Sequence, residues 1–288
     1  MWHSLSVQLS LALGQQFEVE EKMPIDGGDI NECYVITSGE IRFFVKINSR
    51  ENLPIYEAEA EGLRHLANSA EVSVPQVIYM GVIKEKAVLV LDYLPMKPLD
   101  DESAYLLGKD MALLHQWGEQ LEYGFDIDNF IGTTEQRNSW HRKWANFFAD
   151  HRIGWQLKLA EERGMSFGDV ETIVEAVKDR LVGHQPKASL LHGDLWKGNA
   201  SATINGPVVF DPACYWGDRE VDVATTQLFG GFPQDFYRGY NEVFPLDEGF
   251  EQRKDIYNLY HMINHCLMFG GHYLEETEAL INKLGLTE

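Results

Sequence analysis

The pattern of predicted elements changes near residue 95, and this change constrains the fold more than any other feature of the chain. Before it, β-branched and aromatic runs predict strands within residues 17–25, 33–47, 74–78 and 87–91. One helix is predicted among these strands, at 54–68, and an amphipathic helix precedes them. After it, apolar spacing predicts mainly helices, notably 102–117, 138–163 and 169–184. The sequence therefore predicts an α+β fold, with a small antiparallel sheet and one main helix over 1–95 and a larger, mostly helical part over 96–288.

The size and charge of the chain narrow its possible partners. A length of 288 residues is compatible with one large domain or with two lobes around a cleft. Asp and Glu outnumber Lys and Arg by 45 to 24, and the net charge of -21 repels nucleic-acid backbones and anionic membrane surfaces. We therefore expect neither as a partner. An anionic nucleotide stays possible, because one lysine and a bound metal ion can reverse the local field.

The cysteines and the N-terminal residues point to the cytoplasm. Only three cysteines occur, with no CxxC pair and no zinc-ligand spacing: Cys33, Cys214 and Cys266. The first residues lack a basic leader before their apolar positions, and no run of 18 apolar residues is found. We expect a cytoplasmic protein without a membrane span.

The segment 191–222 carries the most informative motif. Asp194 follows a short apolar strand, Asn199 comes five residues later, and Asp211 ends the next strand, which is predicted at 207–210. An isolated aspartate in a loop is usually a turn or cap residue, but turn chemistry does not require this trio. In magnesium-dependent phosphoryl transfer, one Asp accepts the proton of the attacking hydroxyl, while an Asn and a second Asp hold Mg²⁺. We therefore predict Asp194 as the base and Asn199 and Asp211 as the metal ligands.

The phosphate side of such a site needs a positive charge, and Lys46 near the end of a predicted strand is the candidate. A lysine at a strand end is often only a solvated charge. Here, however, a helix bearing three glutamates follows it, and an ion pair with one of them would orient the lysine toward phosphates. We predict Glu59 as the partner, with Glu57 as the alternative. The simpler interpretation is that acidic residues in the first turn stabilise the helix dipole.

Two further segments are candidates for nucleotide contacts. Gly27 and Gly28, followed by Asp29, resemble a phosphate-covering turn, although a Gly-Gly-Asp turn is also ordinary in hairpins. Any such contact would come through backbone N–H groups or through contacts shielded by a metal ion, since Asp29 is a poor neighbour for phosphates. At the end of the predicted sheet, the backbone groups of Asp92 and Leu94 are placed to meet an adenine edge.

Three more residues near the motif have expected roles. Trp196 lies within the Asp194 loop, and its ring suits stacking on a sugar, although packing against the protein is an alternative. Asp222 is expected to brace the Asp194 loop from the next helix. His115 is expected to be a half-buried helix residue.

The chain resembles the fructosamine kinase (ketosamine-3-kinase) family, within the wider group of aminoglycoside and choline kinases. The resemblance extends over essentially the whole chain. Its most specific parts are the tryptophan-containing loop His192–Asn199 and the block Asp211–Asp222. Other parts lie at 44–46, 57–63, 129–155 and 269–273.

This resemblance implies a protein-kinase-like two-lobe fold, with ATP and Mg²⁺ as the phosphoryl donor and its metal. It also implies transfer of the γ-phosphoryl group to the 3-hydroxyl of a ketosamine, either a small adduct or a glycated protein, as a deglycation repair. One departure is Asp29, where the family has a small residue. A second contrast is with protein kinases: Asp211 is followed by Pro, which argues against a flipping activation segment.

Two other functions stay open at this point. One is a kinase for another hydroxylated amine, such as an aminoglycoside or an amino alcohol. The other is a nucleotide-binding regulator without catalysis. The complete set of Lys46, Asp194, Asn199 and Asp211 argues against the second.

Overall fold

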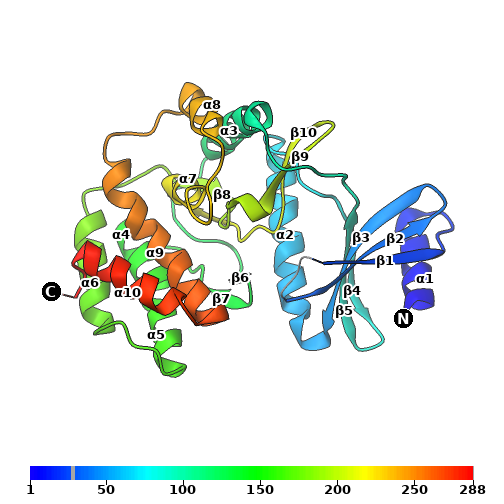
Figure 1. Cartoon of the computed structure of the whole chain (residues 1–288), viewed down its shortest axis with the longest axis horizontal. Helices are drawn as coiled ribbons and strands as arrows, with labels where there is room; N and C mark the ends of the chain where they lie inside the picture. The colour runs from blue at the N-terminus through cyan, green and yellow to red at the C-terminus, as the bar shows by residue number, and fades with distance from the viewer. Residues whose placement is uncertain (27–29, 288) are drawn as a thin grey trace.

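A computed structural model describes residues 1–26 and 30–287, and its N-terminal part is built on one antiparallel sheet (Figure 1). The strand order is β1-β2-β3-β5-β4. The bounds are β1 (Glu21–Ile25), β2 (Glu32–Ser38), β3 (Ile41–Ser49), β4 (Val77–Ile83) and β5 (Lys86–Asp92). Because β3 and β5 are neighbours in register, Lys46 lies opposite Leu89 in the middle of the sheet.

Each face of the sheet is covered by one helix. Alternate residues of a strand point to opposite faces, so Val88 and Val90 pack in the cluster formed with α1 (Trp2–Leu13). Leu89 and Leu91 pack instead in the cluster formed with α2 (Leu53–Ser69). The main helix α2 was predicted at 54–68, whereas the covering role of α1 was not predicted.

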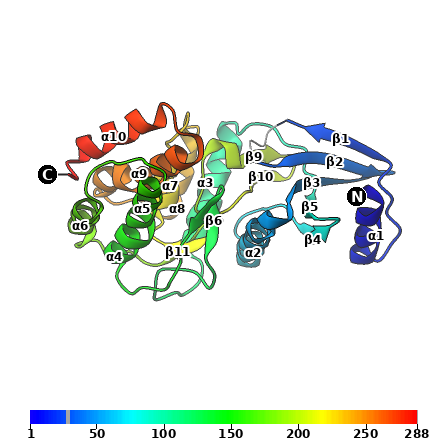
Figure 2. The same cartoon turned by 90° about the horizontal axis from the view of Figure 1, so that it is seen from below.

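The rest of the chain is mostly helical, with one large core that extends through it. Helix α9 is central, because it is buried along most of its length and packs against several of its neighbours (Figure 2). The helices are α3 (Asp101–Gln116), α4 (Trp144–Phe148), α5 (Trp155–Glu162), α6 (Val170–Leu181), α7 (Glu220–Thr225), α8 (Asp235–Val243), α9 (Phe250–Phe269) and α10 (Tyr273–Leu284). The predicted α+β, two-lobe fold is therefore confirmed.

Three short strand pairs lie among these helices, and they carry the loops of the site. They are β6 (Asn129–Ile131) with β7 (Thr134–Gln136), β8 (Ser189–Leu191) with β11 (Tyr215–Gly217), and β9 (Ala200–Thr203) with β10 (Gly206–Val209). The sequence predicted β8 and β10 but not the other four. Strands of three or four residues have too few positions for an alternation to be seen.

Several predicted bounds were wrong. The strand predicted at 17–25 begins only at Glu21. The strand predicted at 74–78 begins at Val77 and continues to Ile83; Pro75 has no N–H group to donate to a ladder. The single helix predicted over 138–163 is an extended segment, then α4, a π-helical turn (Ala149–Gly154) and α5. The extended part is held by β-type pairing, because His141 and Tyr123 exchange backbone hydrogen bonds.

Residues 93–100 connect β5 to α3 and contain the predicted domain boundary. The division into domains 1–95 and 96–288 stays a prediction. Within residues 1–26 and 30–287, no helix combines the length and the hydropathy needed to cross a bilayer.

Candidate active site

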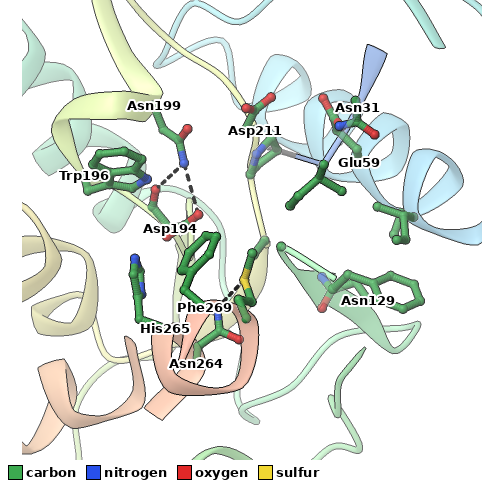
Figure 3. A pocket seen from close by; sticks show the side chains of 18 of the residues that line it. Asn31, Glu59, Asn129, Asp194, Trp196, Asn199, Asp211, Asn264, His265 and Phe269 are labelled. Atoms are coloured by element: carbon green, nitrogen blue, oxygen red, sulfur yellow. Dashed lines mark hydrogen bonds between the residues drawn. The ribbon is translucent and has the colours of Figure 1, made fainter. Parts of the chain in front are cut away.

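The side chains predicted for phosphoryl transfer line one cavity of about 410 Å³ between the sheet and the helical part (Figure 3). Lys46 reaches it from β3 and Glu59 from α2. Asp194 and Asn199 reach it from the loop between β8 and β9, and Asp211 follows β10. Residues far apart in the sequence therefore lie together around one cavity, as the motif predicted.

Lys46 forms ion pairs with two carboxylates. Its Nζ lies 2.8 Å from Glu59 Oε1 and 2.5 Å from Asp211 Oδ1, and the lysine is 7 % exposed. Burial alone would lower the pKa of Lys46, but the two carboxylates outweigh it and raise that pKa, so the lysine is charged. Burial, together with the charge of Asp211, raises the pKa of Glu59. The alternative partner, Glu57, is exposed.

The loop that carries Asp194 is held in place by hydrogen bonds to Asp222, as expected. The Asp222 carboxylate accepts hydrogen bonds from the backbone N–H groups of His192 (2.8 Å) and Gly193 (2.9 Å). A Cβ at Gly193 would lie 2.0 Å from the carbonyl oxygen of Ala213, so only glycine fits there. His115 also contacts Asp222, at 2.9 Å, and its second ring nitrogen lies 2.7 Å from the hydroxyl of Tyr240. The residue is fully buried rather than half-buried as expected, and both of its ring nitrogens have partners.

Asp194 and Asn199 are directly connected. The amide Nδ2 of Asn199 donates to the carbonyl oxygen of Asp194 (2.9 Å) and to its Oδ2 (3.1 Å). Figure 3 shows that the amide oxygen of Asn199 points away from Asp194 and is left as an acceptor. Burial, helped by the nearby Asp211 charge, raises the pKa of Asp194 to about 7.

A histidine that the sequence did not indicate lies next to Asp194. His261 Nδ1, from α9, is 3.6 Å from Asp194 Oδ1. Burial lowers the pKa of His261 to about 3, so its ring is neutral and provides no counter-charge. Its Nε2 lies 2.9 Å from the hydroxyl of Thr225. The spacing of His261 along α9 is that of a core residue, so nothing in the sequence marked it as a functional residue.

The donor set around Asp211 fits a hard divalent cation. Asp211 has a φ of 52°, a left-handed conformation that is uncommon for a residue with a side chain, and its side chain is 45 % exposed. Partial removal of the carboxylate from water opposes its ionisation, but the charge and hydrogen bond of Lys46 outweigh this effect and lower the pKa of Asp211. A carboxylate and an amide oxygen that accepts from no described residue, both lining one cavity, are the ligand types that Mg²⁺ takes.

Helix α2 is packed closely on the segment after Asp211. A Cβ at Gly62 would lie 3.1 Å from Pro212 Cγ and 3.4 Å from Cys214 Sγ. The helix that carries Glu59 is therefore in direct contact with the segment that carries Asp211.

The other predicted nucleotide contacts are placed as follows. Gly27 and Gly28 lie outside the described residues, as does Asp29. The backbone N–H of Asp92 donates to the carbonyl of Gln76 (3.0 Å), so of its backbone groups only the carbonyl remains for an adenine. Neither Asp92 nor Leu94 lines the cavity of Figure 3. Trp196 does line it, with its ring 5.9 Å from that of Phe229 in an edge-to-face arrangement.

The family of the chain follows from its similarity to known proteins. A fructosamine kinase family model matches residues 1–287. The chain belongs to the fructosamine kinase family. A probable ketoamine kinase of Vibrio cholerae is 55% identical over 285 residues, which cover 99% of each chain. The crystal structure of a putative fructosamine-3-kinase from Haemophilus somnus matches with a TM-score of 0.94 and 38% identity, covering 99% of this chain and 97% of that one.

The fold itself is shared more widely. An aminoglycoside phosphotransferase, APH(4)-Ia, solved as a ternary complex with ADP and hygromycin B, matches with a TM-score of 0.65 at 13% identity, over 98% of this chain and 97% of that one. The predicted resemblance to the fructosamine kinase family is therefore confirmed, and the likeness to APH(4)-Ia shows a shared fold. The chain belongs to a family of phosphotransferases.

In this member of the fructosamine kinase family, a buried amide network holds the segment after Asp211. Asn129 Nδ2 donates to the carbonyl of Cys214 (2.7 Å), and Gln136 Nε2 donates to the carbonyl of Ala213 (3.0 Å). The two amides are joined at 2.8 Å, and Tyr260 donates to Gln136 Oε1 at 2.7 Å. The β6–β7 hairpin thereby fixes the backbone two and three residues beyond Asp211.

We expect Gln136→Met to loosen this segment. The substitution keeps the volume but leaves the carbonyl of Ala213 and the hydroxyl of Tyr260 without their partners, which costs about 1–3 kcal/mol for each buried group left unpaired. Urea unfolding should show this loss. If Asp211 holds Mg²⁺ as predicted, the Mg²⁺ concentration at half-maximal nucleotide binding should also rise. Gln227→Met, at an exposed position, is the control. Equal stability of both variants would contradict the role of the network.

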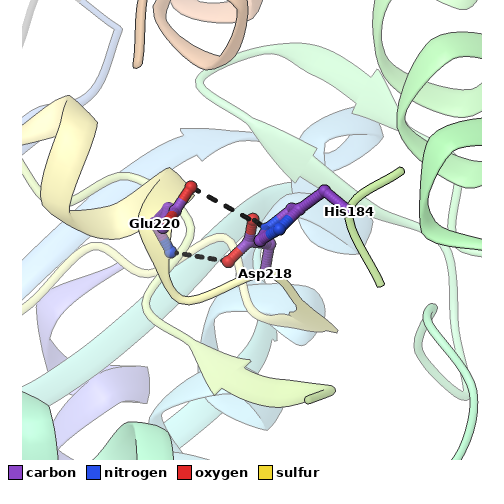
Figure 4. A group of neighbouring side chains, drawn as sticks. All are labelled: His184, Asp218 and Glu220. Atoms are coloured by element: carbon purple, nitrogen blue, oxygen red, sulfur yellow. Dashed lines mark hydrogen bonds and ion pairs between the residues drawn. The ribbon is translucent and has the colours of Figure 1, made fainter. Parts of the chain in front are cut away.

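A second cluster of ionisable groups lies away from the cavity and consists of His184, Asp218 and Glu220 (Figure 4). His184 Nε2 is 2.7 Å from Asp218 Oδ2, and the Tyr257 hydroxyl donates to the same oxygen at 2.5 Å. Both Glu220 oxygens accept hydrogen bonds from Arg253, at 2.7 and 2.8 Å. With its carboxylates already paired to cations and donors, the cluster is an ion-pair network rather than a metal centre.

This network predicts a pH-dependent contribution to stability. Burial alone would lower the pKa of His184, but the hydrogen bond and charge of Asp218 outweigh it and raise that pKa above the ordinary 6.5. The stabilisation is therefore fully present below pH 6.5 and is lost as the pH rises through the higher folded value. Urea unfolding from pH 6 to 8.5 should show a smaller fall for His184→Gln than for the wild type. Parallel pH profiles for the two proteins would exclude this contribution.

Proposed function

We propose that this protein transfers the γ-phosphoryl group of ATP to the 3-hydroxyl of a ketosamine, in a magnesium-dependent reaction. The observation that carries the proposal is the convergence of the Lys46–Glu59–Asp211 ion pairs and the Asp194–Asn199 pair on one cavity. Membership of the fructosamine kinase family supports the ketosamine as acceptor.

In the proposed reaction, Asp194 orients the acceptor hydroxyl and takes its proton as the hydroxyl oxygen bonds to the γ-phosphorus. The bond from that phosphorus to the β–γ bridging oxygen breaks, and ADP leaves with the electron pair. Lys46, held by Glu59, would contact the phosphates of ATP. The amide oxygen of Asn199 and the carboxylate of Asp211 would hold Mg²⁺, which neutralises charge on the phosphates when bound.

The remaining contacts belong to the same proposal. Backbone groups of Gly27 and Gly28 would cover the phosphates, and the carbonyl of Asp92 with the N–H of Leu94 would meet the adenine edge. Trp196 would stack on the sugar. The product, a ketosamine 3-phosphate, would release its amine and so complete a deglycation, on small adducts or on glycated proteins. Three free cysteines fit a reducing compartment such as the cytoplasm.

The test is a direct competition among acceptors. The purified protein is incubated with ATP and Mg²⁺ and with a fructosamine, an aminoglycoside or an amino alcohol. The masses of the products are then measured by mass spectrometry. We expect the fructosamine to gain one phosphoryl group, and NMR of the product to place it on the 3-oxygen. Phosphorylation of only an aminoglycoside or amino alcohol would overturn the substrate assignment. ATP binding without any phosphorylated acceptor would overturn the enzymatic function.

A further inference from the structure

Part of the cavity wall is made of aromatic rings, which form a continuous chain. The ring of Phe229 lies 4.3 Å from that of His265, whose ring is 5.6 Å from Phe269 and 5.0 Å from Tyr273. Together with Trp196 these residues form what we call the aromatic wall. In Figure 3, His265 and Phe269 are drawn below Asp194, whereas Glu59 and Asp211 are drawn above it.

An unpaired acceptor lies beside the aromatic wall. Asn264, on α9, lines the same cavity and is 3 % exposed. Its Nδ2 makes only a weak contact with the Met268 sulfur, at 3.4 Å, and its Oδ1 has no donor among the described residues. A buried carbonyl oxygen without a donor is costly, and a ligand that brings an N–H group would remove that cost.

The charges around the cavity favour a cationic ligand. Lys46 is the only lysine or arginine among the described lining residues, and it is already paired with Glu59 and Asp211. Asp194 adds a third acidic group, which is negatively charged above its pKa of about 7. His265 adds no charge, because burial lowers its pKa and its Nδ1 bonds to the carbonyl of His261 at 2.8 Å.

From this geometry we infer that Asn264 Oδ1 and the aromatic wall form a subsite for the protonated amine of the acceptor. An ammonium group donates to the oxygen and is attracted to the ring faces, whereas a hydroxyl offers only the first contact. The inference rests on the proposed function and deepens it: the acceptor is selected as a cation, and the amine lies on the α9 side of Asp194.

The test compares two sugars that differ in one atom. The first is a fructosamine with a basic secondary amine, and the second is its analogue with an ether oxygen in place of the amine nitrogen. Dissociation constants are measured by tryptophan fluorescence, with Mg²⁺ and a non-hydrolysable ATP analogue present. For the wild type we expect the amine to bind at least about tenfold more tightly than the ether, which corresponds to one charge-assisted hydrogen bond.

Two substitutions of Asn264 should change this ratio in opposite directions. Asn264→Leu removes the acceptor at similar size and should weaken amine binding about tenfold while leaving the ether unchanged. Asn264→Asp adds a negative charge and should raise the ratio above that of the wild type. Asn282→Leu, at an exposed position of α10, is the control for an Asn→Leu change. Urea unfolding of each variant identifies one that fails to fold.

The outcomes separate this inference from the proposed function. Equal affinities of the wild type for the amine and the ether would overturn the amine subsite, even if both sugars were phosphorylated. Loss of affinity for both ligands alike in Asn264→Leu would instead assign Asn264 to a sugar hydroxyl and would also overturn it. If the amine is preferred but neither sugar is phosphorylated, the subsite stands and the proposed reaction fails.

Discussion

Asp194→Asn should lower kcat by about 10²–10⁴-fold, the range typical of a lost general base. The amide has the size of the carboxylate, so the loop braced by Asp222 should keep its shape. What disappears is the acceptor for the proton of the attacking hydroxyl. Steady-state kinetics with a fructosamine and ATP would measure the loss.

Nucleotide binding should survive the same substitution. Lys46, Glu59 and Asp211 are untouched, and the affinity for ATP should therefore change by less than about twofold, because uniform binding does not depend on the proton acceptor. Asp179→Asn, at an exposed position, is the matched control and should be fully active. A variant with near-normal kcat would show that Asp194 is not the base.

Lys46→Met is the second change with a large expected effect. It removes the cation between two carboxylates, so kcat/KM should fall roughly 10²–10³-fold through lost stabilisation of charge on the phosphates. Stability should fall as well, since breaking a buried ion pair costs roughly 3–5 kcal/mol. We expect the lower end, because the Asp211 side chain is 45 % exposed and water screens its charge.

A double substitution separates the two effects of Lys46. Adding Glu59→Gln to Lys46→Met removes the unpaired buried carboxylate and should restore part of the free energy of unfolding, but none of the activity. Lys158→Met, on the exposed face of α5, is the control. If Glu59→Gln lowers the stability of Lys46→Met further, the ion pair does not act as described.

The segments that could be predicted from the sequence are those whose signal is local. The motif from Asp194 to Asp211 is carried by 18 consecutive residues, and a strand followed by a glutamate-bearing helix was enough to pair Lys46 with Glu59. In each case short-range chemistry and the element type agree.

The missed residues act through contacts between distant elements. His261 and Asn264 have the spacing of core residues on α9, and nothing in that spacing shows that they face a cavity. Asn129 reaches a carbonyl 85 residues away in the sequence. The helix predicted over 138–163 was wrong for a similar reason: the π-helical turn buries Arg152, whose Nη2 donates to Asn138 Oδ1 at 2.6 Å.

The close packing of Gly62 on Pro212 has a consequence for chemical inhibition. In protein kinases the position of the glutamate-bearing helix is a control point, and an outward movement of that helix would open a second pocket beside the site. Here that movement would pull α2 away from the segment after Asp211, which the amide network also holds. We therefore expect compounds that depend on a displaced helix to find no such pocket, and selective inhibitors to be those that occupy the cavity in the shape it already has.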